Sequence, residues 1–384
     1  MPSSLLSALR AAQLLFFLSF ICIPSPTHGS CSCGYLLNTT PSQQQQQQQQ
    51  TLYTHALETD FLHLPSYTTT TPPPLNGSAW SPQSYLVPAE QARGPWGKNA
   101  SVGNVVLKPL GEGKWDAEGG EAGLEIWVRK VEEGRGYVGM GEVATGRRDM
   151  LFGTFRVGMR MSGVGGTCGA FFWYYNDTQE IDLEFLSHQN TPTTHPLNLV
   201  LQSPSSASAG FNAANTSTFQ LHSLPFDPAT DFHEYRFDWS PSSVSFYGDG
   251  VLLDTMTEAV PNSPGHLTLS HWSNGDPGWS GGPPDVDAVM RVEYVKAYFN
   301  SSDEELMKEW EKGCKDPQAV NATCVIPDSP SGNASGKTVF LSQQDGTGGK
   351  SGGKKSEAVE MVALSLDTVF FHRVAFLFAF WILL

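Results

Sequence analysis

Six consecutive residues, from Glu180 to Phe185, constrain the fold of this chain more than any other stretch. Their sequence, Glu-Ile-Asp-Leu-Glu-Phe, alternates acidic and apolar side chains with a period of two. This period is typical of a β-strand that has one buried face and one polar face. The pattern predicts that one side of the strand is buried and carries Ile181, Leu183 and Phe185. The opposite side then carries an acidic row, Glu180, Asp182 and Glu184.

The acidic row is unusual for an ordinary sheet surface. Three adjacent carboxylates repel one another, and no Lys or Thr lies between them to offset the repulsion. A solvated acidic face would give the same spacing, so the spacing alone is weak evidence. The preceding sequence strengthens it, because residues 166–175 read Gly-Thr-Cys-Gly-Ala-Phe-Phe-Trp-Tyr-Tyr. These residues predict an aromatic strand, which ends in a turn at residues 176–178.

Together these stretches resemble glycoside hydrolase family 16, whose signature is Glu-x-Asp-x-Glu after such an aromatic strand. Residues 180–184 fit the uninterrupted form of the signature, and the resemblance covers roughly residues 55–300. The family includes fungal members that are secreted and anchored at the cell surface. The resemblance implies that Glu180 is the nucleophile, that Glu184 is the acid/base, and that Asp182 tunes and orients both.

The residue types suit this chemistry. A retaining glycosidase needs a nucleophilic carboxylate and a proton-donating carboxylic acid whose carboxyl groups are roughly 5 Å apart. Residues i and i+4 of a flat strand are about 13 Å apart at Cα. Two long Glu side chains must therefore lean toward each other over the shorter Asp. Crowding also separates the pKa values of the three groups, which keeps one protonated while another is ionised.

The resemblance implies an all-β fold, a concanavalin A-like jelly-roll β-sandwich of two antiparallel sheets with a concave substrate cleft. The chain itself favours a sandwich, because short strands with Gly-rich turns recur from residue 102 onward. Residues 124–129 and 151–160 alternate cleanly, and Asp249-Gly250 predicts a tight turn between two strands.

Matching to the family also assigns residues to substrate binding. Phe172 and Tyr174 are expected to face the cleft and to stack on sugar rings, while Phe171, Trp173 and Tyr175 face the core. The alternative is that all five aromatic side chains belong to the core.

Four further positions follow from the same resemblance. Asn198 matches a position that hydrogen-bonds sugar hydroxyls, although an ordinary strand Asn fits equally well. Trp272 and Trp279 are expected to stack on sugars, with a structural role as the alternative for each. Arg156 stands where relatives often carry a cleft-facing Glu, and it is included among the expected substrate contacts.

The N-terminal part of the chain predicts a secreted protein. Residues 1–30 resemble a signal peptide. Their apolar run is too short for a transmembrane helix, which needs about 20 residues. A retained anchor is the alternative. Eight Asn-x-Ser/Thr sequons agree with secretion. Residues 31–54 form a Cys- and Gln-rich segment, and residues 55–300 form the catalytic domain.

The C-terminal part predicts a surface-attached protein. Residues 301–324 are expected to form a short helix, with Ser302 as its cap and Glu305 completing a capping box, followed by a Cys-containing extension. Residues 325–360 are a Gly-, Ser- and Lys-rich linker. Residues 361–384 are a hydrophobic tail that fits a glycolipid (GPI) signal. The expected location is therefore the cell surface or cell wall.

Removal of the signal would leave five cysteines, an odd number. Cys314 and Cys324 could pair with each other, or each could pair within the segment Cys31-Ser32-Cys33. Cys168, at the start of the aromatic strand, is expected to be a buried free thiol. A metal site is not expected, because no His shares the spacing of these cysteines.

These features predict a retaining endo-β-glucanase that hydrolyses β-1,3/1,4-glucan by double displacement. The alternatives are a cell-wall glucan transglycosylase and a non-catalytic, lectin-like glucan-binding protein. A formal charge of −15 argues against a nucleic acid partner. No cofactor is expected and calcium binding stays open, as do the linkage cleaved and the pairing of the cysteines. The protein is expected to act as a monomer.

Overall fold

The protein is described here from a computed structural model. The structure describes residues 31–39, 49–64, 79–110, 121–328 without 133 and 215, and 338–341. The expected signal peptide, most of the linker and the hydrophobic tail lie outside these residues. None of the helices in the described part of the chain has the length and apolar character that crossing a bilayer requires.

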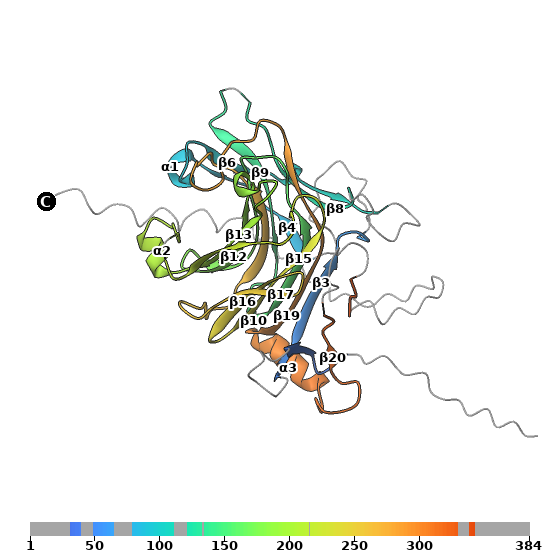
Figure 1. Ribbon diagram of the computed structural model, residues 1–384. Helices are drawn as coiled ribbons and strands as arrows, with labels where there is room; N and C mark the ends of the chain where they lie inside the picture. The colour runs from blue at the N-terminus through green and yellow to red at the C-terminus, as the bar shows by residue number, and fades with distance from the viewer. Residues whose placement is uncertain are drawn as a thin grey trace, which may run out of the picture. The chain divides into compact units, whose positions relative to one another are not determined.

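Two large sheets form the body of the protein, as the fold prediction requires (Figure 1). The eight-stranded sheet has the order β17 (Val251–Met256), β16 (Ser243–Gly248), β15 (His233–Ser240), β10 (Met150–Arg160), β19 (Ala288–Ser301), β8 (Gly123–Val128) and β7 (Val105–Lys108), and β3 (His55–Asp60) also pairs with β19. The nine-stranded sheet has the order β14 (Phe219–Ser223), β13 (Pro196–Gln202), β12 (Gln179–Leu186), β11 (Cys168–Asn176), β18 (His266–Trp272), β9 (Tyr137–Thr145), β6 (Gly97–Ala100) and β5 (Tyr85–Val87), and β4 (Trp80–Pro82) also pairs with β9.

The pairing is antiparallel throughout both sheets except between β6 and β9, which run parallel. The expected turn at Asp249-Gly250 joins β16 to β17, and both of its residues have positive φ, 46° and 77°. This backbone conformation explains why Gly follows Asp at the turn.

The two sheets pack face to face through aromatic side chains. Trp173 of β11 lies 4.4 Å from Trp239 of β15 between ring centroids, and Phe185 of β12 lies 4.8 Å from Tyr235 of β15. These residues belong to one core cluster that draws on both sheets. The structure is therefore an all-β sandwich, and one side of β12 forms part of its core.

A smaller sheet joins the two ends of the described chain. It has the order β2 (Gln49–Tyr53), β1 (Tyr35–Thr39) and β20 (Cys324–Val325). Disulfides link Cys31 to Cys324 and Cys33 to Cys314. Of the two pairings that the sequence left open, the structure has the one that ties the N-terminal segment to the C-terminal extension. Cys168 is a free, buried thiol, as expected.

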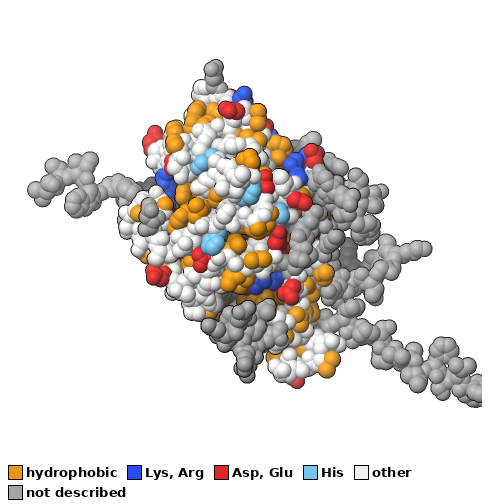
Figure 2. Space-filling model, in the orientation of Figure 1, with side chains coloured by type: hydrophobic (Ala, Val, Ile, Leu, Met, Phe, Trp, Pro, Cys, Tyr) orange, Lys and Arg blue, Asp and Glu red, His pale blue; other side chains and the backbone are white. Residues whose placement is uncertain are grey.

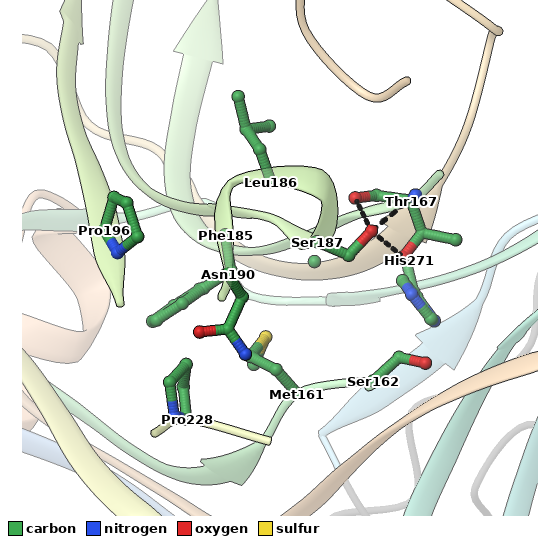
Figure 3. A pocket seen from close by; sticks show the side chains of 11 residues that line it. Met161, Ser162, Thr167, Phe185, Leu186, Ser187, Asn190, Pro196, Pro228 and His271 are labelled. Atoms are coloured by element: carbon green, nitrogen blue, oxygen red, sulfur yellow. Dashed lines mark hydrogen bonds between the residues drawn. The ribbon is translucent and has the colours of Figure 1, made fainter. Parts of the chain in front are cut away.

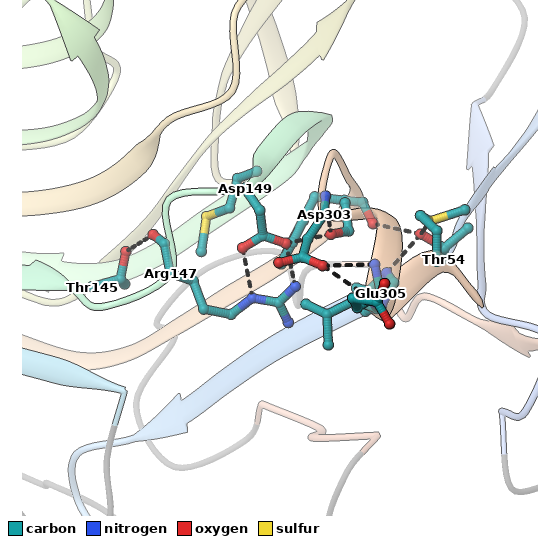
Figure 4. A network of polar contacts seen from close by, with 12 residues as sticks. Thr54, Thr145, Arg147, Asp149, Asp303 and Glu305 are labelled. Atoms are coloured by element: carbon teal, nitrogen blue, oxygen red, sulfur yellow. Dashed lines mark hydrogen bonds and ion pairs between the residues drawn. The ribbon is translucent and has the colours of Figure 1, made fainter. Parts of the chain in front are cut away.

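Three α-helices lie among the described residues: α1 (Ala89–Ala92), α2 (Pro204–Ser208) and α3 (Glu304–Gly313). The cap of α3 is Asp303 and not Ser302, because the Asp303 carboxylate accepts the backbone N–H groups of Glu305 (2.9 Å) and Leu306 (3.1 Å). Ser302 instead donates its backbone N–H to the carbonyl of Asp149 at 2.9 Å. Figure 4 shows the polar network that holds this end of the helix.

Candidate active site

Strand β12 presents the three acids on the outer face of the nine-stranded sheet, as the alternation predicts. Ile181, Leu183 and Phe185 lie in the core, and Asp182 on the opposite side is only 4% exposed. The outward neighbours of the acids in the adjacent strands are Tyr174, Phe172 and Ala170 on β11 and Gln202, Val200 and Asn198 on β13.

The acids perturb one another's ionisation. Burial raises the pKa of Glu180 to about 8, against the opposing effect of a hydrogen bond with Asp182. Burial, and then the charges of Glu180 and Glu184, raise the pKa of Asp182 well above its usual range. Burial also raises the pKa of Glu184. Their hydrogen bond lowers the pKa of Glu180 and raises that of Asp182, and the two groups titrate as a pair.

The Glu184 carboxylate receives hydrogen bonds from two different elements. The Cys168 thiol on β11 donates to Glu184 Oε1 at 3.5 Å. The side chain of Trp279, in the loop after β18, is also hydrogen-bonded to Glu184. Both donors lower the pKa of Glu184 because they favour its ionised form.

Three charged side chains that the sequence did not single out surround the acids. Glu142 on β9 accepts a hydrogen bond from the Tyr85 hydroxyl at 2.9 Å. The Lys98 ammonium on β6 lowers the pKa of Glu142 and of Glu184. Arg93, directly after α1, lowers the pKa of Glu180 and of Glu184. These cations partly offset the negative charge that four carboxyl groups bring to one face.

One contact connects segments that follow strands near opposite edges of the nine-stranded sheet. Arg93 lies between α1 and β6, and Phe211 lies in the loop between α2 and β14. The Arg93 guanidinium donates from Nη1 to the Phe211 carbonyl at 3.2 Å and lies 5.4 Å from the centre of its ring. Figure 1 shows α1 and α2 on the same side of the sandwich. Since the charge of Arg93 reaches Glu180 and Glu184, the Arg93–Phe211 contact lies close to the acid row.

The aromatic residues expected at the site take different roles. Phe172 and Tyr174 lie on the outer face beside the acids, and Tyr174 donates its hydroxyl proton to Asp177 Oδ1 at 2.7 Å. Lys98 Nζ lies 4.4 Å from the ring centre of Trp272, so the ammonium occupies one face of that indole. Trp279 hydrogen-bonds Glu184, as described above.

Asn198 lies next to Glu184 but is fully buried. Its side-chain amide donates to the Glu184 backbone carbonyl at 3.2 Å and to Gln189 Oε1 at 3.0 Å. In the structure its amide donor therefore orders the end of β12. The Asn198 side-chain oxygen, Oδ1, has no hydrogen-bond partner. Because it is buried, a sugar can reach it only if the surrounding side chains move.

Two expectations for the site are wrong. Arg156 lies on β10 of the eight-stranded sheet, opposite Arg236 and Lys296, and donates to the carbonyl of Pro327 at 2.7 Å. It is 2% exposed and is not among the residues that surround the acids. Tyr175 is 47% exposed and not in the core, because the β11–β12 register shifts between Tyr174 and Asn176.

A small pocket lies at the end of β12, beyond the acids (Figure 3). Its lining includes Phe185, Ser187 and Asn190, together with His271 of β18, and none of the three acids. Within the described residues, no group of three or more His, Cys, Asp or Glu side chains is arranged to hold a metal ion. On the face seen in Figure 2, Lys and Arg side chains lie scattered among acidic ones and form no basic patch.

A two-sheet β-sandwich with a row of mutually perturbed carboxyl groups on one face, the central one buried and the outer two half-buried, has the groups that glycosidases use. Residues 112–296 match the family model for glycosyl hydrolases family 16. The matched stretch, just under half of the chain, is similar to this family. The two-sheet β-sandwich agrees with the fold that the sequence predicted.

Individual relatives agree on the region but not on the whole chain. A β-glucanase of Bacillus licheniformis is 30% identical over 158 residues, which are 38% of this chain and 58% of the relative. The Congo red hypersensitive protein 1 of Saccharomyces cerevisiae is 26% identical over 161 residues, 38% of this chain and 29% of the relative. The chain spans about half the length of the first curated relatives it matches. A solved Bacillus licheniformis β-glucanase aligns with a TM-score of 0.47 and 20% identity, covering 63% of this chain and 97% of that structure.

Proposed function

We propose that the protein is a retaining endo-glycosidase that hydrolyses β-1,3/1,4-glucan by double displacement. The observation that carries the proposal is the row of three carboxyl groups, Glu180, Asp182 and Glu184, on the outer face of β12. Asp182 is hydrogen-bonded to Glu180, and burial raises the pKa of Glu184, which suits a proton donor. Relatives named β-glucanase support a β-glucan as the substrate.

In the first step the Glu180 carboxylate attacks the anomeric carbon and forms a glycosyl ester, while Glu184 gives its proton to the departing glycosidic oxygen. In the second step Glu184, now ionised, takes a proton from water, and the water oxygen displaces Glu180 from the anomeric carbon. The sugar product then has the anomeric configuration of the substrate, because each step inverts it once. Asp182 makes no covalent bond, and its hydrogen bond favours the ionised form of Glu180.

Transfer is the second candidate activity, because a sugar hydroxyl can replace water in the second step. One observation favours it: the Arg93–Phe211 contact lies close to the acid row and Trp279 is hydrogen-bonded to Glu184, and side chains packed around the acids restrict free water near the intermediate. A lectin-like role needs no proton donor and acceptor, and it leaves the two donors on Glu184 without a purpose.

The test is a product profile of the purified protein on pure β-1,3-, β-1,4- and mixed-linkage glucans, with and without added oligosaccharide acceptors. Shorter products alone support hydrolysis, and products longer than the acceptor support transfer. Binding without any new product would overturn both and leave the lectin-like role. Glu184→Gln serves as the matched inactive control, since it keeps the side-chain shape and removes the titrating proton.

We further propose that the protein is secreted and attached to the outer surface by a glycolipid, acting there as a monomer. The signal-like residues 1–30 and the apolar tail support this, as do the two disulfides, since such bonds persist in oxidising compartments. Recovery of a peptide containing Trp381 from the mature surface protein would rule out the glycolipid, because the signal that contains it is removed on attachment.

A further inference from the structure

The acid/base carboxylate is held between two donors that come from different parts of the chain. Cys168 lies on the outer face of β11, two residues before Ala170, and Ala170 is the register partner of Glu184. The small Ala170 side chain leaves room for Glu184 to lean along the strand toward the thiol. The Cys168 Sγ to Glu184 Oε1 distance of 3.5 Å is within hydrogen-bond range for sulfur.

The thiol is placed to act only as a donor. Cys168 is 0% exposed, and it does not face the core, because it shares the outer face of β11 with Phe172 and Tyr174. Burial, and then the neighbouring Glu184 charge and their hydrogen bond, raise its pKa well above the usual range. The sulfur therefore keeps its proton and offers it to Glu184.

The second donor is fixed by a folded loop. Trp279 donates its backbone N–H to the Asp276 carbonyl at 3.1 Å, and its ring lies 6.2 Å from that of Phe219 on β14. Asn274 attaches the same loop to α1, since its side-chain amide donates to the Ala92 carbonyl at 2.7 Å. The loop that carries Trp279 is thus held by contacts that do not involve the strand that carries the thiol.

The remaining charged groups around Glu184 act in both directions. Glu184 and its strand neighbours Glu180 and Asp182 repel one another when ionised, whereas Lys98 on β6 and Arg93 after α1 favour the ionised form of Glu184. The residues of β13 and β14 that pair nearest to it, Asn198 and Leu221, do not titrate. Against burial, the two direct donors favour the ionised form of Glu184.

We propose that Cys168 is a positioning residue for the reaction: its thiol, opposite Trp279, holds the Glu184 carboxylate in one orientation and lets it release its proton. This inference rests on the proposed function, in which Glu184 must be an acid in the first step and a base in the second. A buried carboxyl group without these donors stays protonated to higher pH and is a poor base in the second step. The thiol itself neither touches substrate nor forms a bond.

The test compares Cys168→Ala, Cys168→Val and Cys168→Ser in the full secreted chain. Val fills the space of the thiol without a donor, and Ser restores a donor. We expect the basic limb of the pH profile of kcat/KM to rise by about half a unit to one unit for Ala and Val. Ser is expected to return it close to the wild-type position. Identical profiles for all four proteins would overturn the proposal, as would the same shift for Ser and Val.

A direct titration separates failure of this inference from failure of the proposed function. The carboxyl carbon signals of 13C-labelled glutamate are followed by NMR against pH, and Glu184→Gln identifies the Glu184 signal. The pKa of Glu184 is expected to rise in Cys168→Val and not in Cys168→Ser, whether or not any glucan is cleaved. Absence of activity with this NMR result would contradict only the proposed function, and an unmoved NMR signal in an active enzyme would contradict only the role of Cys168.

Discussion

Asp182 is hydrogen-bonded to Glu180, its neighbour on the same face of β12, and this bond acts oppositely on the two acids. It stabilises Glu180 as a carboxylate and Asp182 as a carboxylic acid. Two like carboxyl groups that share one buried proton titrate as a pair, and the partner that donates keeps the proton. The central Asp thereby opposes the effect of burial, which raises the pKa of Glu180 to about 8.

Asp182→Asn is expected to raise stability and lower activity. Asn does not titrate, so the cost of protonating the Asp182 carboxyl group on folding at neutral pH disappears. The folded-state pKa of Asp182 is raised, so the native protein holds more protons than the unfolded chain above about pH 4. Its contribution to stability is therefore present below that pH and is lost as the pH rises toward the folded pKa. The variant should melt at a higher temperature than the wild type at pH 7, with a smaller difference at pH 4.

The activity of Asp182→Asn should fall and its pH optimum should move, while the stereochemistry of the product stays retained. Thermal unfolding at both pH values and a pH–rate profile provide the check. A lower melting temperature at pH 7 would contradict a raised pKa of Asp182 in the folded protein.

Exchanging each glutamate for Ala should separate their roles. Glu180→Ala is expected to lower activity by at least about 10³-fold, and azide should then attack the anomeric carbon and give an inverted product. Glu184→Ala should spare substrates with activated leaving groups, and azide should give a retained product, because the intermediate still forms on Glu180. The anomeric configuration of the azide products, measured by proton NMR, distinguishes the nucleophile from the acid/base. Retained product from Glu180→Ala would assign the nucleophile to another residue.

Local alternation was sufficient to predict which side of β12 is buried, because the period of two places side chains on fixed faces. It could not tell which sheet a strand joins, and Arg156 shows the consequence. Its strand alternates like the others, yet it pairs with β15 and β19 in the eight-stranded sheet. The prediction that Tyr175 faces the core was wrong for a related reason, since a register shift at the end of β11 breaks the alternation there.

Other parts of the site depend on contacts between distant segments. Lys98 and Arg93 precede the acid row by more than 80 residues and carry no pattern of their own. Glu142 left a faint signal, as a single acid in the otherwise uncharged strand β9. The role of Cys168 was missed although its burial was predicted. The direction in which its side chain points follows from the pairing of β11 with β12 and cannot be read from composition.

Buried histidines should make the protein sensitive to acid. Burial lowers the pKa of His271 to about 4, and its ring is hydrogen-bonded to the Ile126 carbonyl at 2.9 Å. Burial also lowers the pKa of His266 to about 4. The unfolded chain binds protons below about pH 6.5 and the native protein does not, so the free energy of unfolding falls as the pH drops from about 6.5 to about 4. His271 alone accounts for about 3 kcal/mol of this loss.

His271→Gln is the variant that checks this, since Gln can still donate to Ile126 and cannot be protonated. Urea unfolding at several pH values between 4 and 7 should show a shallower pH dependence than the wild type. An unchanged slope would mean that another group controls acid unfolding.

The two disulfides should matter for stability and not for catalysis. Each joins residues more than 280 positions apart, and the small sheet that they fasten contacts the eight-stranded sheet, where Tyr35 lies 5.2 Å from Tyr298 between ring centres. Replacing Cys33 and Cys314 together by Ser is expected to cost roughly 2–5 kcal/mol. Calorimetry measures the loss, and kcat well below the melting temperature should match the wild type. Replacing Cys31 and Cys324 provides the matched control, and a large fall in kcat for either pair would place the small sheet in the catalytic machinery.

The Arg93–Phe211 contact should control access of long chains to the acids. Both residues have positive φ, 59° and 63°, which is unfavourable for side chains other than Gly, so a stable contact must hold them there. A polymer that is cleaved within its length must reach the acids, and the contact lies close to the acid row. Phe211→Ala should therefore raise kcat/KM for polymeric glucan relative to a short oligosaccharide, with an unchanged pH profile.

Arg93→Ala should raise the same ratio and also move the pH profile to higher pH, because the charge of Arg93 lowers the pKa of Glu180 and Glu184. Arg93→Lys keeps the charge and loses the planar group, so it should change the ratio and spare the profile. Equal ratios in all four proteins would show that the contact does not limit entry and that the polymer reaches the acids by another path.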